Sequence, residues 1–223
     1  MNKYEIVQKI ESFAPLDTQE SWDASGWAVE KEGNNVEKIM FALTITKDAF
    51  EQALQKNCDM IISHHPLFFV PFEYKKINIY CAHTNLDRAE GGTTDTLIKK
   101  LGFEKSEDID FVRIVKLKAP ITTEDLKQKL LKISPKLRYV NNSKTKEVST
   151  IGFCAGSGSE FINETNADAF VTGDLKFHTA LDSNKLVFDI GHFESEIFAP
   201  QILKEITEVG EKGVIADEKS PFI

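Results

Sequence analysis

The chain has 223 residues, 41% of them hydrophobic, which suffices for one large domain or two small ones with a substantial core. Its 35 acidic residues outnumber 27 basic ones, and the net charge of −8 disfavours nucleic acid as a partner, because non-specific binding to it needs a cationic surface. The longest apolar stretch, residues 66–72, is too short to cross a bilayer, and the N-terminus lacks a signal-peptide pattern. We therefore expect a cytoplasmic protein without a membrane partner.

Hydrophobic spacing predicts helices and strands that alternate along the chain. Ile6, Ile10 and Phe13 lie at helical spacing and predict a first helix at 3–13, which Pro15 ends. Strands are predicted at 38–44, 59–63, 76–82, 111–117, 137–140, 147–154, 167–172, 185–190 and 213–216. Further helices are predicted at 48–56, 94–101, 123–133 and 194–209. This interleaving predicts an α/β class, or α+β with mixed sheets.

The three cysteines, Cys58, Cys81 and Cys154, lie in or beside apolar runs and form no CxxC pair. We expect buried free thiols in a reducing compartment rather than a thiolate zinc site.

All five histidines lie in short segments that follow apolar, strand-like runs. They are His64, His65, His83, His178 and His192. Imidazoles and carboxylates at strand ends suit a hard-to-borderline metal, because both offer lone pairs and a loop lets them converge. This distribution predicts a metalloprotein, and specifically a hydrolase.

The first two of these segments supply four candidates. Adjacent His64 and His65 lie at a turn that Pro66 helps to form, where they can converge on one metal or each bind a different metal. His83 and Asp87 lie four apart; Asp87 is a candidate ligand or a turn cap, and His83 either orients a ligand or packs as an ordinary residue.

His192 and Glu196 are also four apart and would share one face of a helix that begins near Gly191. Glu194 is the competing carboxylate and would point elsewhere on that helix. His178 is a candidate substrate contact or general acid/base, with ordinary helix packing as the alternative.

The Gly156-Ser157-Gly158-Ser159 segment lies at a predicted strand-to-helix junction. Its backbone N–H groups could hold a phosphate, or it could be a plain tight turn.

The order of several motifs resembles the Nif-three-like family, also called GTP cyclohydrolase I type 2 homologues. The motifs are residues 22–26, 61–67, 83–87, 91–92, 155–158, 172–174, 191–192 with Glu196, and 219–222. The resemblance implies a two-lobed fold, a dinuclear metal centre between the lobes, and ring-shaped homohexamers. The family ligands map onto His64, His65, Asp87, His192 and Glu196. Ala24 and Thr44 depart from the family pattern, where Asn and Asp are usual.

Ligand content suggests a division of the chain. Residues 1–104 and 146–223 would form the metal-binding α/β lobes as one unit, and residues 105–145 a small intervening segment without ligands.

These observations predict a hydrolase that depends on two divalent ions per chain, with Zn, Mn or Fe favoured by the His and carboxylate set. The catalytic candidates are His178 and His83, which would transfer protons. The expected substrate is a small molecule, either GTP as the family label suggests or another nucleotide or phosphoester. The alternative is a non-catalytic metal-binding or interaction protein with a regulatory role.

Overall fold

Helices and strands alternate in the computed structural model, which describes residues 1–222. Two units emerge from the packing: residues 1–92 with the chain from Phe198 onward, and residues 93–197. The division predicted from the sequence, at residues 104/105 and 145/146, was based on which segments carry candidate ligands, whereas the two units are defined by their internal packing. Residues 105–145 supply three strands to the same sheet as the later strands of the second unit.

The first unit is built on a five-stranded sheet of order β1-β4-β3-β2-β11. Its strands are β1 (Gly26–Val29), β2 (Ile39–Ala42), β3 (Met60–Ser63), β4 (Asn78–Cys81) and β11 (Gly213–Ile215). All neighbours pair in parallel except β1, which runs antiparallel to β4. β2, β3 and β4 are buried at every position, as expected for strands covered on both faces.

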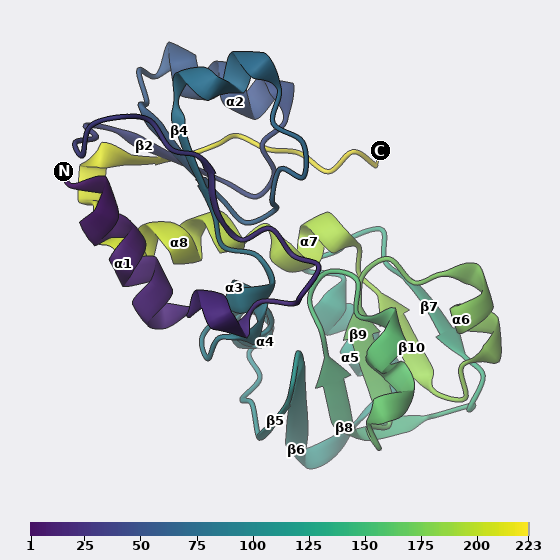
Figure 1. Ribbon diagram of the computed structural model, residues 1–223. Helices are drawn as coiled ribbons and strands as arrows, with labels where there is room; N and C mark the ends of the chain where they lie inside the picture. The colour runs from purple at the N-terminus through teal and green to yellow at the C-terminus, as the bar shows by residue number, and fades with distance from the viewer. Residues whose placement is uncertain (223) are drawn as a thin grey trace. The chain divides into compact units, whose positions relative to one another are not determined.

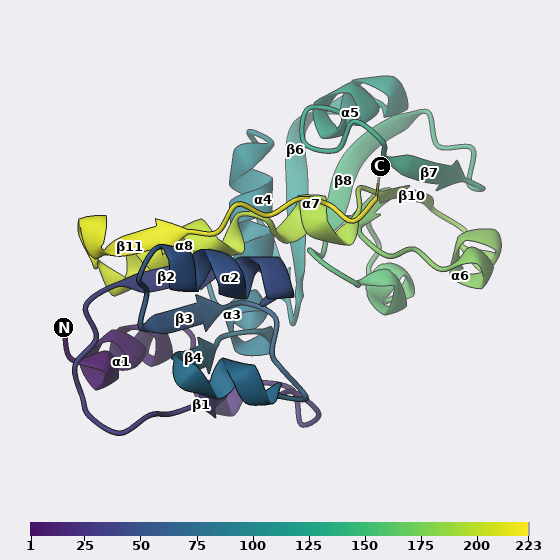
Figure 2. The ribbon, with the colours of Figure 1, turned by 90° about the horizontal axis from the view of Figure 1, so that it is seen from above.

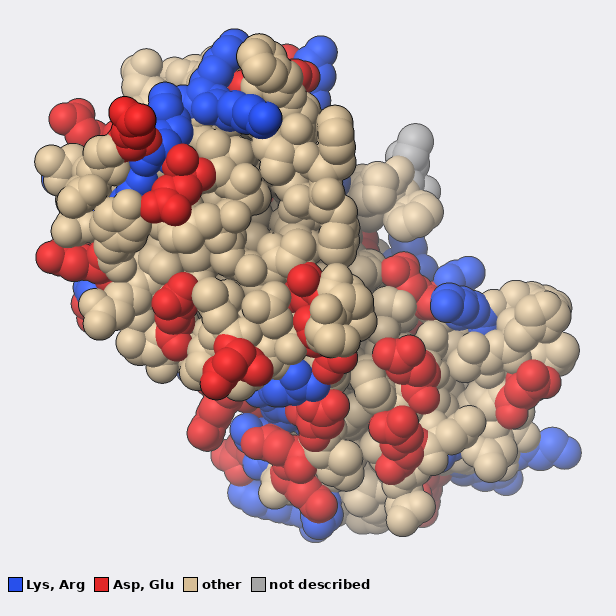
Figure 3. Space-filling view, viewed as in Figure 1, with Lys and Arg blue, Asp and Glu red and all other residues tan. Residues whose placement is uncertain are grey.

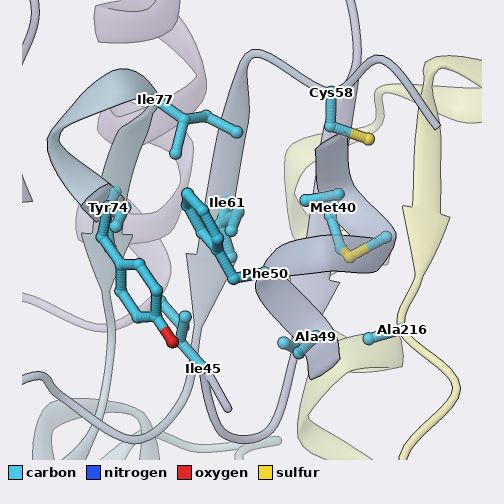
Figure 4. Packing of buried hydrophobic residues seen from close by; sticks show 12 residues of the cluster. Met40, Ile45, Ala49, Phe50, Cys58, Ile61, Tyr74, Ile77 and Ala216 are labelled. Atoms are coloured by element: carbon cyan, nitrogen blue, oxygen red, sulfur yellow. The ribbon is translucent and has the colours of Figure 1, made fainter. Parts of the chain in front are cut away.

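Helices cover both faces of this sheet (Figure 1). The helices of this unit are α1 (Lys3–Phe13), α2 (Lys47–Gln55), α3 (Thr84–Arg88) and α8 (Ala199–Thr207). Figure 1 shows α2 on one face and α1 and α8 on the other. Under α2, Phe50 stacks on Tyr74 with ring centroids 4.1 Å apart, and both pack with Met40 and Ile61 of the sheet (Figure 4).

The second unit is built on a six-stranded sheet of order β5-β6-β8-β9-β10-β7. Its strands are β5 (Glu107–Ile109), β6 (Val112–Thr122), β7 (Arg138–Asn141), β8 (Glu147–Phe153), β9 (Ala169–Thr172) and β10 (Leu186–Asp189). β8, β9 and β10 are parallel, and the flanking strands pair antiparallel, so this sheet is mixed as well. Its helices are α4 (Thr93–Lys100), α5 (Thr123–Leu130), α6 (Phe177–Asp182) and α7 (His192–Glu196).

The main differences from the sequence prediction lie in short elements and in the last helix. β1, β5 and α3 were not predicted, since each has only three to five residues and little periodicity. The helix predicted at 194–209 is two helices, α7 and α8. Pro200 lies in the first turn of α8, where its missing N–H is tolerated, whereas a continuous helix would place it in the interior.

Within residues 1–222, every helix is too short or too polar to span a bilayer. On the face shown in Figure 3, Asp and Glu side chains are interspersed among the Lys and Arg side chains, so the basic residues do not form one continuous surface. Cys58, Cys81 and Cys154 are buried free thiols, as predicted.

Candidate metal centre

In the first unit, the candidate ligands lie where three parallel strands end. Ala42 of β2, Ser63 of β3 and Cys81 of β4 are aligned in register, so the segments that follow them meet at one edge of the sheet. Those segments carry Thr44, the His64–His65 pair and His83. The carboxyl ends of parallel strands are the usual ligand-binding edge of an open α/β sheet.

His64 is fully buried, and both of its ring nitrogens face polar groups. Nδ1 lies 2.9 Å from the carbonyl oxygen of Ala82, and Nε2 lies 3.5 Å from Oδ1 of Asp87. Since a carbonyl only accepts, Nδ1–H donates to it and the Nε2 lone pair faces the Asp87 side. Asp87 comes from α3, the short helix that begins directly after His83.

His65 is oriented by Thr44. Its Nδ1 lies 2.6 Å from the hydroxyl of Thr44. Its ring centroid lies 5.1 Å from that of His64 and 5.6 Å from that of His83. One nitrogen from each of these three rings lies within 4.8 Å of the other two, so this cluster could hold a metal ion.

His83 pairs with Asp23, whose side chain is fully buried. Nδ1 of His83 donates to Oδ1 of Asp23 at 2.9 Å, which leaves Nε2 for a ligand or a proton. Burial would raise the pKa of Asp23, but hydrogen bonds from His83 and Thr84 outweigh it and hold the pKa well below its usual range. Trp22, 59% exposed, packs edge-on against the His83 ring. His83 is thus tied to a carboxylate rather than being an ordinary packed residue.

In the second unit, the same geometry recurs after the parallel strands β8, β9 and β10. Asp174 follows β9, and His192 begins α7 directly after β10. His192 Nδ1 lies 2.7 Å from Oδ2 of Asp174, and Nε2 lies 2.9 Å from Oε2 of Glu196. Burial lowers the pKa of His192, but Glu196 and then Asp174 outweigh it and raise the pKa to about 10. The helical spacing therefore does bring His192 and Glu196 together, as predicted.

Glycines create the room for this pair. Gly156 has φ of +67°, and a Cβ built on it would lie 2.0 Å from Oε1 of Glu196. A Cβ on Gly173 would lie 2.7 Å from the backbone nitrogen of His192. Any larger residue at either position would displace the His–Glu pair.

The glycine-rich segment itself is used internally. The amide of Gly156 donates to the Ser195 hydroxyl at 2.9 Å, and that of Gly158 donates to the Thr172 hydroxyl at 2.8 Å. These bonds favour the tight-turn interpretation over a phosphate cradle at these two amides.

The other candidates lie apart from these pairs. Glu194 has its carboxylate over Gly191, where a Cβ would meet Oε2 at 2.2 Å. His178 is exposed on α6, where its ring packs against Phe177. Both ribbon views place α6 apart from α7 within the second unit (Figures 1 and 2).

Sequence reasoning missed three supporting residues, Asp23, Thr44 and Asp174, as partners of histidines. Asp174 could have been found, because it is an acidic residue directly after a buried strand. Asp23 lies in one of the motifs that carry the family resemblance, and Thr44 lies at a position that departs from its pattern. Neither signal identified a histidine as the partner, because those partners lie 60 and 21 residues away along the chain.

Fold and donor chemistry together define an α/β protein with two mixed sheets and His–carboxylate groups that could bind metal. The family model of Duf34/NIF3 (NGG1p interacting factor 3) matches residues 1–216. The chain belongs to this family.

Named relatives agree with that assignment. A Clostridium acetobutylicum protein named GTP cyclohydrolase 1 type 2 homolog is 32% identical over 227 residues, covering 86% of this chain and 84% of its own. A Clostridium perfringens protein of the same name is 30% identical over 261 residues and covers 100% and 99%.

Solved structures share the fold. Reduced HcgD from Methanocaldococcus jannaschii has a TM-score of 0.84 at 25% identity, covering 98% of each chain. A crystal structure of a Thermus thermophilus protein has a TM-score of 0.86 at 23% identity, covering 99% of this chain and 100% of its own.

Proposed function

We propose that the chain is a hydrolase that depends on two divalent ions, held by donors from both units. The proposed ligands are His64, His65, Asp87, His192 and Glu196. Imidazole and carboxylate donors in this ratio suit Zn, Mn or Fe better than Ca or Mg.

One observation carries this proposal: each of the three ligand histidines has Nδ1 occupied by a polar group of its own unit. The partners are the Ala82 carbonyl for His64, the Thr44 hydroxyl for His65 and the Asp174 carboxylate for His192. Metal-ligating histidines almost always bond their second nitrogen in this way, because it sets the tautomer and aims the ring. Nε2 is therefore the nitrogen through which His64, His65 and His192 would bind metal.

His83 is the better placed of the two proton-transfer candidates. Its Nδ1–H is held by Asp23, so Nε2 can accept a proton and return it, and its ring lies beside those of His64 and His65. His178 remains the second candidate, for a step that an exposed group on α6 could serve. When bound, two divalent ions would lower the pKa of a shared water and offset the negative charge that develops on the substrate.

The proposed substrate is a small molecule of the nucleotide or phosphoester class. The name of the Clostridium relatives points to GTP, with opening of the guanine imidazole ring as the corresponding reaction. Family and fold do not by themselves determine the substrate, so the assay begins from a panel of nucleotides and phosphoesters.

A second candidate function is a non-catalytic metal-binding or interaction protein. The family description as an NGG1p interacting factor favours it. A protein that binds metal fully yet turns over no member of the panel supports this alternative over the hydrolase.

The decisive experiment is elemental analysis of wild type and two matched variants of α7. We expect about two ions per chain in wild type, loss of metal in E196Q, and wild-type content in E194Q, because Glu194 lies over Gly191 rather than against His192. Turnover should fall together with metal in E196Q. Wild-type protein that takes up no Zn or Mn at neutral pH would refute the metal proposal.

A further inference from the structure

The segment that follows β11 reaches back to the end of β2 through Glu218. One carboxylate oxygen accepts from the amide of Leu43 at 2.6 Å and the other from the amide of Thr44 at 2.8 Å. Two successive backbone donors on one carboxylate form a bidentate, charge-assisted contact, which holds both donors in one geometry.

The two residues before Glu218 are also held by hydrogen bonds. Before it, the amide of Ala216 donates to Phe41 of β2 at 2.9 Å. Next to it, the Gln52 side chain of α2 donates to the carbonyl of Asp217 and accepts from its amide, both at 2.9 Å. The hydrogen bonds of Ala216 and Asp217 therefore fix the backbone that places Glu218 at the end of β2.

Thr44 connects this contact to the metal candidates. Its amide is held by Glu218, and its hydroxyl lies 2.6 Å from Nδ1 of His65. A threonine hydroxyl is neutral and short, so it needs an accurately placed backbone to meet the ring, whereas the longer-range attraction of a carboxylate would be more tolerant.

We propose that Glu218 is a positioning residue for His65: it holds the backbone of Leu43 and Thr44 so that the Thr44 hydroxyl engages Nδ1 and leaves Nε2 aimed at the metal. This inference rests on the proposed role of His65 as a ligand. It assigns the C-terminal segment a part in metal binding, although it supplies no ligand itself.

The test is a double-mutant cycle between Glu218 and Thr44, read by Zn²⁺ affinity in competition with a chelating dye. E218Q keeps the size of the side chain but can accept with only one oxygen, so one backbone amide loses its partner. T44V removes the hydroxyl at nearly constant volume. We expect T44V to weaken Zn²⁺ affinity by roughly 10-fold or more, the range typical of residues that contact and orient a metal ligand. E218Q acts on His65 only through Thr44 and keeps one acceptor oxygen, so we expect a smaller loss of roughly 3- to 10-fold.

Coupling distinguishes positioning from general destabilisation. If Glu218 acts through Thr44, E218Q adds no further loss of affinity in the T44V background. The long-range ¹H–¹⁵N NMR signals of the His65 ring should shift in E218Q in the same direction as in T44V, while those of His192 stay in place. E211Q removes an exposed charge from the same unit and should match wild type in both measurements.

If E218Q fails to fold, Q52A provides the same test, because it releases Asp217 without touching the end of β2. Wild-type Zn²⁺ affinity in E218Q, or losses that multiply in the double variant, would overturn the inference while leaving the metal proposal intact. Wild-type protein that binds no Zn²⁺ would overturn both.

Discussion

Replacing Asp23 by Asn tests how the fold controls His83. Oδ1 of Asp23 accepts from Ala24 N and from His83 Nδ1, whereas Oδ2 accepts from Ser25 Oγ and from both the amide and the hydroxyl of Thr84. An amide has only one acceptor oxygen, so the D23N side chain can accept either the hydrogen bonds made to Oδ1 or those made to Oδ2, but not both sets. We expect the oxygen to stay with buried Thr84 and the NH₂ to face His83 and Ala24.

That orientation has two consequences. Ala24 is exposed, so its backbone amide can donate to water instead. The variant then loses the charge-assisted character of the remaining hydrogen bonds, which should lower the free energy of unfolding by about 1–3 kcal/mol. The NH₂ group also donates to Nδ1 of His83, which moves the ring proton to Nε2. The group proposed to accept a proton is then already protonated, and turnover should fall roughly 100-fold or more with metal content unchanged.

Urea unfolding at pH 7 measures the stability loss, with D17N as an exposed acidic control that should match wild type. The low pKa of Asp23 gives the sign of the pH dependence. Its contribution is present above the unfolded value of about 4 and is lost as pH falls toward the lower native value, so wild type and D23N should converge in acid. NMR of the imidazole nitrogens reports the tautomer of His83.

Two results would refute this reasoning. An unfolding free energy of D23N equal to that of wild type at pH 7 would show that the buried carboxylate is not needed. An unchanged His83 tautomer, together with full turnover, would show that Asp23 does not set the state of the ring.

Three further predictions concern the second unit and the assembly. G156A should displace Glu196, reduce metal uptake and lower the free energy of unfolding by about 2–4 kcal/mol, because of backbone strain and overlap with Glu196. G210A is the control: Gly210 also has a positive φ, but open space surrounds the position of its Cβ, so the loss should be only about 1 kcal/mol. Equal losses in the two variants would contradict a specific role for Gly156. H178N should keep its metals and slow turnover by roughly 100-fold if His178 carries a proton, and full activity would remove it from the mechanism. Light scattering should detect a closed homohexamer, as the family resemblance implies, and a monomer at micromolar concentration would contradict that expectation.

Local patterns were enough to predict most of the elements that carry the site. The apolar runs before His64, His83 and His192 predicted buried strands, and β3, β4 and β10 lie there. A spacing of four placed His192 and Glu196 on one helix face, and their side chains meet at 2.9 Å. Both inferences work because strand burial and helical periodicity depend on neighbours within a few residues.

Short elements and breaks escaped the same reasoning. β1 and α3 are too short for a period to show, and the single helix predicted at 194–209 placed Pro200 in a helix interior, where proline is disfavoured, instead of in the first turn of α8. The α7–α8 break also coincides with the passage of the chain from the second unit to the first, which follows packing rather than local pattern.

The sequence by itself determined which residue types are available for metal and on which strand ends they lie. Only the tertiary structure decided which polar group holds each histidine: Thr44 for His65, Asp23 for His83 and Asp174 for His192. These partners are 18 to 60 residues apart along the chain. Their pairing depends on the register of β2, β3 and β4 in one sheet and of β9 and β10 in the other, and on the antiparallel pairing of β1 with β4, because register sets which segments meet at a sheet edge.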